Sequence, residues 1–276
     1  MLKSGLYIVA TPIGNLEDIS ARAVKVLENA DVVACEDTRV CQKLFSLLGL
    51  SCNKKMICYE DHREEKTAQA IVEMIKEGKS VALVSDAGSP LISDPGYKLV
   101  RLCRQCGLDV FAVPGACAVV CALQLSGLPT NRFMFAGFIE NKQKARRDLF
   151  NELKDINTTL VFYETASRLV ETLKVAEEVF GEREIAVARE ITKLYEECVS
   201  GTAAELLEHF CEKAPKGEIV LMVAPPFKKE LDIDVEEELK KRLKTMSLKS
   251  AATEVAALSG IKKNEIYALG LKLKNE

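Results

Sequence analysis

Tryptophan is absent from this 276-residue chain, and histidine occurs only twice. A zinc site normally takes four Cys or His ligands, and the only close cysteine pair is Cys103 and Cys106. That pair falls in LVRLCRQCGL, whose apolar residues follow helical spacing, so we predict no metal site. The six tyrosines are scattered, and without tryptophan the sequence alone identifies no residue for stacking on an RNA base.

Long apolar runs are also missing. No run approaches the roughly 20 residues that a membrane-spanning helix needs, and the stretch from Leu6 to Ala10 is too short for the core of a signal peptide. We therefore expect a cytoplasmic protein without membrane contact, whose ten cysteines are reduced thiols. Hydrophobic residues make up 48% and charged residues 29% of the chain, a balance typical of globular proteins.

The common phosphate-binding motifs, G-x-G-x-x-G and G-x-x-x-x-G-K-[ST], do not occur, which disfavours a nucleoside triphosphate or an ordinary dinucleotide as ligand. Three other turns contain glycine and proline after a predicted strand: Thr11–Asn15, Ser85–Pro90 and Pro114–Ala118. Any one of them is readily explained as a plain connection between a strand and a helix. Ligands bind outside the carboxyl ends of strands in open parallel sheets, so the three together predict a cleft. Glycine there lets the backbone approach a ligand closely.

Short apolar runs alternate with stretches of helical periodicity through the first half of the chain. This alternation predicts a parallel sheet with helices on both faces. The predicted strands lie in 5–10, 31–39, 56–61, 79–84 and 108–113, and the helices in 16–30, 41–48, 67–76, 97–107 and 116–127. The second half has predicted strands in 133–140, 158–165, 184–191, 195–202 and 218–225, with helices in 144–154, 167–179 and 202–211.

These patterns predict an N-terminal α/β domain over 1–116 and a second α/β domain over 117–226. A Pro-led, charged linker over 227–238 follows, and then a basic tail over 239–276 with two helices, 246–258 and 262–274, as a helix-turn-helix. The tail carries nine Lys or Arg and three acids, whereas the preceding residues carry 29 basic and 38 acidic side chains. A basic appendage on an acidic body suggests contact with a polyanion, although a solvated helical face explains the charge equally well.

Several strings carry a resemblance to a known family: VATPIGNLEDIS, ACEDTR, LVSDAGSPLISDPGY, VPGACA, ARE-I-TK and SGIKKNEIY. Together they resemble the bacterial small-subunit ribosomal RNA methyltransferases of the I type, which are cytidine 2′-O-ribose methyltransferases within the tetrapyrrole methylase-like superfamily. The resemblance runs in order from Leu6 to about Tyr267. It implies the class III methyltransferase fold with two α/β domains and a C-terminal helical appendage, S-adenosyl-L-methionine held between the domains, and a homodimer. The implied substrate is a cytidine ribose in the decoding centre of 16S rRNA in the 30S ribosomal subunit.

The same resemblance implies a set of cofactor-binding residues, drawn from the three turns and from the ends of two strands of the second domain. These residues are Thr11, Pro12, Asp86, Ala87, Gly88, Ser89, Ile92, Pro114, Gly115, Ala116, Cys117, Ala118, Phe162, Tyr163, Val187 and Ala188. Ala116 and Ser167 stand where the family more often has proline and histidine.

A ribose hydroxyl is a poor nucleophile, so a nearby base or cation should accept or stabilise its proton. We predict Asp86 and Glu36 to matter for activity, followed by Lys193, without assigning the base. Other roles remain open: Glu36 in an ion pair with Arg39, Asp86 capping amides of its own loop, and Lys193 anchoring a phosphate. The predicted RNA-binding cations are Arg39, Lys142, Lys144, Arg146, Arg147, Arg168, Arg189, Lys262 and Lys263.

Two rival functions fit parts of the sequence. A methyltransferase of the same fold acting on a small, tetrapyrrole-like acceptor would keep the cleft but have no need of the basic tail. A nucleic-acid-binding protein without enzymatic activity would use the tail but leave the three turns unexplained.

Overall fold

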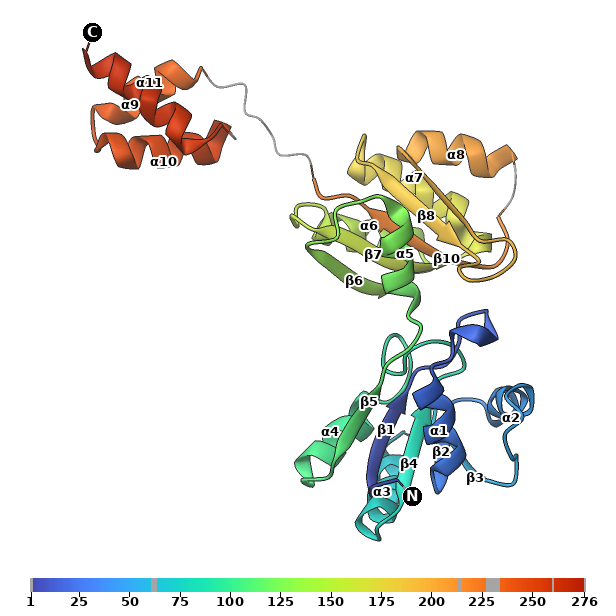
Figure 1. Cartoon of the computed structure of the whole chain (residues 1–276). Helices are drawn as coiled ribbons and strands as arrows, with labels where there is room; N and C mark the ends of the chain where they lie inside the picture. Colours follow the sequence, from blue (N-terminus) through green and yellow to red (C-terminus); the bar gives the residue numbers. More distant parts are fainter. Residues whose placement is uncertain (1, 61–63, 213–214, 227–233, 260, 276) are drawn as a thin grey trace. The chain divides into compact units, whose positions relative to one another are not determined.

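The computed structural model describes residues 2–60, 64–212, 215–226, 234–259 and 261–275 (Figure 1). The chain divides into two compact units, Met1–Pro225 and Pro226–Glu276. The larger unit contains two five-stranded sheets, and the smaller is helical. The predicted α/β fold with a helical appendage is therefore confirmed.

The first sheet is parallel throughout, with the strand order β3-β2-β4-β1-β5. Its strands are β1 (Gly5–Val9), β2 (Val32–Cys35), β3 (Lys55–Cys58), β4 (Ser80–Val84) and β5 (Val110–Val113). Its helices are α1 (Ala21–Asn29), α2 (Thr38–Leu47), α3 (Glu64–Lys76) and α4 (Tyr97–Gln105). One face packs on α1 and α2 and the other on α3 and α4, so the predicted parallel sheet with helices on both faces is confirmed.

The helix predicted over 16–30 is interrupted, and here the prediction needs correction. The Ser20 hydroxyl accepts a hydrogen bond from the Ala23 amide and so begins α1 five residues later than expected. Residues Leu16–Asp18 form a separate 3-10 turn, capped by Asn15, whose side chain accepts a hydrogen bond from the Glu17 amide. Two polar caps within six residues thus outweigh an apolar periodicity that continues through them.

The second sheet is mixed, with the order β6-β7-β10-β8-β9, and only β6 and β7 run parallel. Its strands are β6 (Phe133–Phe138), β7 (Thr159–Thr165), β8 (Ile185–Arg189), β9 (Glu197–Gly201) and β10 (Glu218–Val223). Helices α6 (Gln143–Leu153), α7 (Leu169–Phe180) and α8 (Ala203–Glu212) cover one face. The opposite face packs on α5 (Ala118–Ser126), the helix that directly follows the Pro114–Ala118 turn.

Among its described residues, the smaller unit has three helices where two were predicted: α9 (Val235–Leu243), α10 (Leu248–Ser259) and α11 (Lys263–Asn275). α9 begins inside the predicted linker because the Asp234 carboxylate accepts hydrogen bonds from the amides of Glu236 and Glu237. Residues 227–233 of that linker and the predicted turn at Gly260 lie outside the described residues. A core of Leu239, Ala251, Ala252, Val255 and Ile266 holds the helices together. Within the described ranges, no helix is both long and apolar enough to span a membrane.

Candidate functional site

The three predicted turns are joined by hydrogen bonds. Thr11 and Gly88 exchange two backbone bonds, of 2.8 and 3.1 Å between N and O, and the Thr11 hydroxyl donates to the Ser85 carbonyl at 3.2 Å. The Ser89 hydroxyl donates to the carbonyl of Ala116 at 3.0 Å. The ends of β1, β4 and β5 therefore form one continuous rim, as expected at the carboxyl edge of a parallel sheet.

Two glycines in this rim allow the close approach. Gly88 has φ +84°, a left-handed conformation that glycine adopts without strain, and a Cβ there would lie 3.1 Å from Ile13 Cγ2. At Gly115 an added Cβ would lie 2.9 Å from the Cβ of Ala10. A larger side chain at either position would push the turns apart.

A cavity of about 410 Å³ opens at this rim and is lined by residues of both sheets. Its volume suits a ligand the size of a nucleoside conjugate, because small-molecule sites usually enclose about 300–1,000 Å³. The lining combines apolar residues with several carboxyl groups. The lining residues are Ile13, Glu36, Asp86, Ala87, Gly88, Ser89, Ile92, Ser93, Asp94, Cys117, Ala118, Phe138, Tyr163, Glu164, Thr165, Ile191, Gly217, Glu218, Ile219 and Val220.

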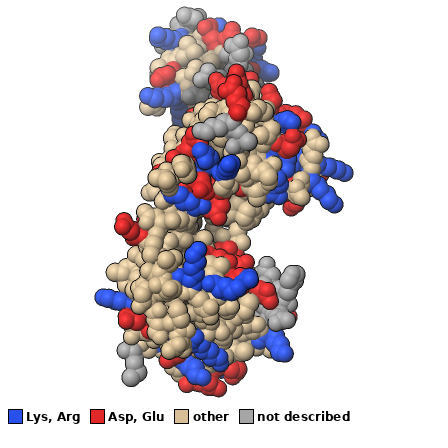
Figure 2. Space-filling view, turned by 90° about the vertical axis from the view of Figure 1, so that its right-hand side faces the viewer, with Lys and Arg blue, Asp and Glu red and all other residues tan. Residues whose placement is uncertain are grey.

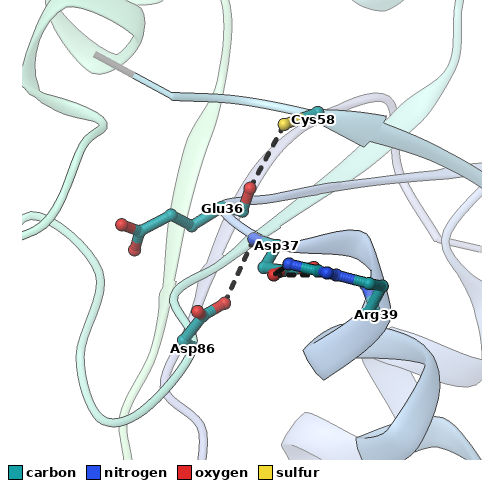
Figure 3. A network of polar contacts seen from close by, with 5 residues as sticks. All are labelled: Glu36, Asp37, Arg39, Cys58 and Asp86. Carbon is teal, nitrogen blue, oxygen red and sulfur yellow. Dashed lines mark hydrogen bonds and ion pairs between the residues drawn. The ribbon is translucent and has the colours of Figure 1, made fainter.

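Glu36 and Asp86 follow the neighbouring strands β2 and β4 (Figure 3). Both residues line this cavity. Asp86 accepts a hydrogen bond from the Asp37 amide at 3.2 Å, so it ties its loop to the start of α2 instead of capping amides of its own loop. Arg39 pairs with Asp37 at 2.6 Å and lowers the pKa of that carboxyl to about 2. In Figure 3 the Glu36 carboxyl points away from Arg39. The ion pair considered for Glu36 is thus made by Asp37.

Asp94 is a third carboxyl group at the cavity, and the sequence did not single it out. Burial raises its pKa above the ordinary value, and the nearby Asp86 acts in the same direction, although a hydrogen bond from Ser85 opposes both. Burial also raises the pKa of Tyr163, whose ring lies edge-on to Phe135 and Phe138. Perturbed carboxyl and phenol groups in one cavity are a feature of functional sites.

Glu164 is also at the cavity, but its carboxylate is occupied. Arg168 donates to it from Nε at 2.8 Å and pairs with it at 2.7 Å, and the hydroxyl of Thr172 donates to the other oxygen at 2.5 Å. A buried carboxylate satisfied by these donors supports the wall of the site. The same contacts hold the side chain of Arg168, predicted to bind RNA, against Glu164, and 25% of that side chain stays exposed.

Lys193 lies at the junction of the two sheets. Its ammonium binds Glu190 at 2.9 Å and Glu218 at 3.0 Å, and a Cβ added to Gly14 would lie 2.5 Å from Lys193 Cγ. Burial lowers the pKa of Lys193, but the two carboxylates outweigh burial and the pKa is raised. Lys193 is therefore a cation at neutral pH, which suits electrostatic stabilisation better than the role of a base.

The turn that carries Lys193 is strained. Glu190 has φ +50° and Thr192 has φ +66°, values that are uncommon for residues other than glycine. The Thr192 hydroxyl is buried and has no hydrogen-bond partner in the described part of the chain. Leu91 and Ser93, on the other side of the cavity, also have positive φ. Such strain tends to collect at functional sites, and here Ser93 and Ile191, the residue between Glu190 and Thr192, both line the cavity.

The predicted cofactor-binding residues fall into three groups. The residues that line the cavity are Asp86, Ala87, Gly88, Ser89, Ile92, Cys117, Ala118 and Tyr163. The residues of the bordering turns are Thr11, Pro12, Pro114, Gly115 and Ala116. Phe162, Val187 and Ala188 are fully buried within the two cores of the second sheet, so their side chains support the wall without lining the cavity.

The segment Gly217–Val220 lines the cavity although the sequence did not point to it. β10 runs antiparallel to β7, with Glu218 opposite Thr165, so the beginning of β10 lies beside the end of β7. A search for ligand-binding residues only at the carboxyl ends of strands misses this segment. The available signal was the sequence KGE, in which a glycine and two charged residues stand at the start of β10.

Four of the five predicted RNA-binding arginines pair with a carboxylate of the protein, although the side chain of Arg39 stays 87% exposed. Arg39 pairs with Asp37, Arg147 with Glu178 and Arg189 with Glu197, as Arg168 does with Glu164. Arg146 is only 3% exposed, so its guanidinium is not presented at the surface. The lysines predicted to bind RNA are exposed: Lys142, Lys144, Lys262 and Lys263. On the face shown in Figure 2, basic and acidic side chains are interspersed and do not form one continuous basic patch.

Within the described ranges, no three His, Cys, Asp or Glu side chains converge as metal ligands. Cys103 is buried in the core beneath α4 and Cys106 is exposed, so the two thiols of the C-x-x-C pair have different surroundings.

Comparison with known families gives two matches. Residues 5–207 match the family described as Tetrapyrrole (Corrin/Porphyrin) Methylases, and residues 229–274 match the RsmI C-terminal HTH domain. Among curated proteins, "Ribosomal RNA small subunit methyltransferase I" of Erythrobacter litoralis is 51% identical, over 99% of this chain and 96% of that protein. The protein of the same name from Pasteurella multocida is 44% identical, over 97% of this chain and 96% of its own length.

Solved structures support the fold. Diphthine synthase superposes with a TM-score of 0.60 at 17% identity, over 79% of this chain and 89% of that chain. Uroporphyrin-III-C-methyltransferase from Thermus thermophilus superposes with a TM-score of 0.56 at 21% identity, over 80% of this chain and 94% of that chain. At these identities the likeness shows a shared fold only.

Proposed function

This chain belongs to the ribosomal RNA small subunit methyltransferase I family of tetrapyrrole methylases, and from this premise we propose that it methylates RNA of the small ribosomal subunit. The donor in this proposal is S-adenosyl-L-methionine. The observation that carries the proposal is the single cavity in which all three glycine-containing turns meet the carboxyl groups of Glu36, Asp86 and Asp94.

The lining of this cavity fits the proposed donor. Apolar side chains such as Ile13, Ile92 and Val220 suit an adenine ring, and the carboxylates suit the positive charges of a sulfonium and an amino group. When bound, the donor supplies a methyl group activated by the sulfonium. The chain's own contribution is then mainly to align the acceptor oxygen with that methyl group and to exclude water, and positioning of this kind lowers a barrier by about 7–11 kcal/mol.

At the finer level, we propose that the acceptor is the 2′-hydroxyl of a cytidine in the decoding centre of 16S rRNA, presented by the 30S subunit. The strings TPIGNL, EDTR and SDAGSPLISDPG support this choice over a small-molecule acceptor. Asp86 and Glu36 are the candidates for accepting the hydroxyl proton, and Lys193 supplies a fixed positive charge at the junction of the sheets. The proposed setting is the cytoplasm, and the proposed assembly is a homodimer.

Mass spectrometry of 16S rRNA nucleosides tests this function. A strain that lacks the gene should lose one ribose-methylated cytidine, and a plasmid copy of the gene should restore it. If no ribose methylation disappears, or if none returns on complementation, the proposal is wrong. Methylation of a tetrapyrrole by the purified protein, with none of 30S particles, would move the assignment to the small-molecule alternative.

A further inference from the structure

The loop between β8 and β9 presents two unusually exposed apolar residues. Leu194 is 88% exposed and Tyr195 is 69% exposed, the two highest values among the large hydrophobic side chains of the described residues. Most proteins keep such side chains partly covered, so adjacent exposed ones suggest a contact surface.

This loop is held rigidly. The Lys193 amide donates to the Glu190 carbonyl at 3.0 Å, and the Glu196 amide donates to the Lys193 carbonyl at 3.1 Å. The Glu196 carboxylate accepts a hydrogen bond from the Thr192 amide at 2.6 Å, which closes the loop from the other side. Tyr195 is thus presented on a fixed backbone, and little conformational entropy is lost when a ligand packs on its ring.

A second cavity of about 480 Å³ lies beside this loop. Tyr195 forms part of its wall together with His209, Lys216 and Arg189. Glu190 and Lys216 line the second cavity, and the next residues in the chain, Ile191 and Gly217, line the first. The same two segments of the chain therefore border both cavities.

The charges of the second cavity are largely balanced within the protein. Of its two carboxylates, Glu190 is paired with Lys193 and Glu197 with Arg189. Lys216 is the remaining full charge in the wall, and it is exposed. The site therefore combines an aromatic ring, an imidazole and an exposed ammonium, which are groups that bind an unpaired nucleotide through stacking and phosphate contact.

We propose that this second cavity binds an unpaired nucleotide of the RNA substrate, with its base stacked on Tyr195 and a phosphate at Lys216. The proposal rests on the proposed function, because it concerns a neighbour of the nucleotide whose ribose enters the first cavity. It assigns a base-stacking residue to a chain without tryptophan and without a continuous basic patch on the face in Figure 2.

The test compares Tyr195→Ala with Tyr195→Phe in the full-length protein, using 30S subunits from a strain that lacks the gene. Tyr97→Ala is the matched control, since Tyr97 is also exposed, at 63%, but lines neither cavity. Initial rates at varied 30S concentration give KM and kcat. Calorimetry gives the affinity for S-adenosyl-L-methionine, and light scattering gives the molar mass.

Loss of one base stack should raise the KM of Tyr195→Ala for 30S by about tenfold or more. Its kcat and its donor affinity should stay within about twofold of the wild type. Tyr195→Phe keeps the ring and should behave like the wild type, as should Tyr97→Ala. Lys216→Ala should raise KM by a smaller factor and weaken the salt dependence of binding.

An unchanged KM in Tyr195→Ala would overturn the proposal, as would a defect of equal size in Tyr195→Phe. A change of molar mass in Tyr195→Ala would assign the exposed loop to an interface between copies of the chain instead. If the wild-type protein fails to label 30S at all, the proposed function is wrong and the nucleotide site falls with it. By contrast, if the wild-type protein labels 30S and Tyr195→Ala leaves this activity intact, only the nucleotide site is wrong.

Discussion

At the scale of single residues, the carboxyl groups of the first cavity have distinct surroundings. Asp86 accepts a backbone hydrogen bond from the start of α2, Glu164 is held by Arg168, and Asp94 is partly buried. The sequence pointed to Asp86 and Glu36 because they are polar residues of SDAG and EDTR, two strings that carry the family resemblance. It missed Asp94, which lies ten residues after β4, because only the folding back of the long loop brings it to the cavity.

Asp86→Ala should reduce methyl transfer by at least about a hundredfold, since it removes both a candidate proton acceptor and a charge at the donor site. Stability should fall by only about 1 kcal/mol, the usual cost of one hydrogen bond. Asp86→Asn keeps an oxygen that accepts the hydrogen bond from the Asp37 amide but removes the negative charge. Comparing the two variants therefore separates the effect of the hydrogen bond from the effect of the charge. Rates with 30S subunits and thermal melting measure the two effects, and full activity in Asp86→Ala would remove this residue from the site.

Asp94→Asn should stabilise the protein at neutral pH and lose this advantage in acid. Burial raises the pKa of Asp94 in the folded state above the ordinary 3.8, so between the two pKa values the folded state holds the proton more often. Stability contributed by this group is therefore highest in acid and is lost as the pH rises through the folded pKa. Urea unfolding between weakly acidic and neutral pH measures the difference, with the exposed Asp148→Asn as control. A gain that does not depend on pH would contradict the assignment.

At the scale of secondary-structure elements, the sequence predicted every strand of the described residues, because most of these strands are short apolar runs bounded by turn residues. It also predicted that the turns after β1, β4 and β5 would share one rim. The direction of β10 could not be predicted, since strand pairing in a mixed sheet depends on contacts distant in the sequence. The start of α1 was misplaced because a local cap at Ser20 interrupted the periodicity.

Gly14→Ala should weaken donor binding through Lys193. The added methyl group would lie 2.5 Å from Lys193 Cγ and displace the side chain that binds Glu190 and Glu218. Lys193→Ala removes the side chain with which the added methyl group would clash. The loss of donor affinity in the double variant Gly14→Ala/Lys193→Ala should therefore be smaller than the sum of the losses in the two single variants. Calorimetry with S-adenosyl-L-methionine on all four proteins gives the coupling energy. Additive effects would show that the two side chains do not meet.

At the scale of the whole molecule, the chain has a larger unit that carries both cavities and a smaller helical unit with its own core. We still propose a boundary between two α/β domains near residues 116 and 117, because α5 directly follows this point and packs on the second sheet. The basic charge of the tail indicated a separate module. It did not indicate α9, whose acidic first turn resembled a linker in composition.

A chain shortened to residues 1–226 should bind S-adenosyl-L-methionine with an affinity within about twofold of the full-length protein. Among the described residues, every one that lines either cavity lies before residue 226. Its activity on 30S subunits should fall if the tail contacts RNA, and should stay unchanged if the basic helices are only a solvated face. Calorimetry and KM for 30S separate these results, and loss of donor binding in a folded fragment would contradict the assignment of the cavities to the larger unit.

The two cavities are lined by adjoining residues, so any coupling between the proposed donor site and the proposed RNA site would be reciprocal. Whatever factor the methyl donor imposes on the affinity for 30S, RNA must impose the same factor on the affinity for the donor. The strained turn at Glu190 and Thr192 is the segment through which such reciprocity would pass. With positive coupling, the enzyme would hold its donor more tightly while RNA is bound and less tightly once the RNA has left.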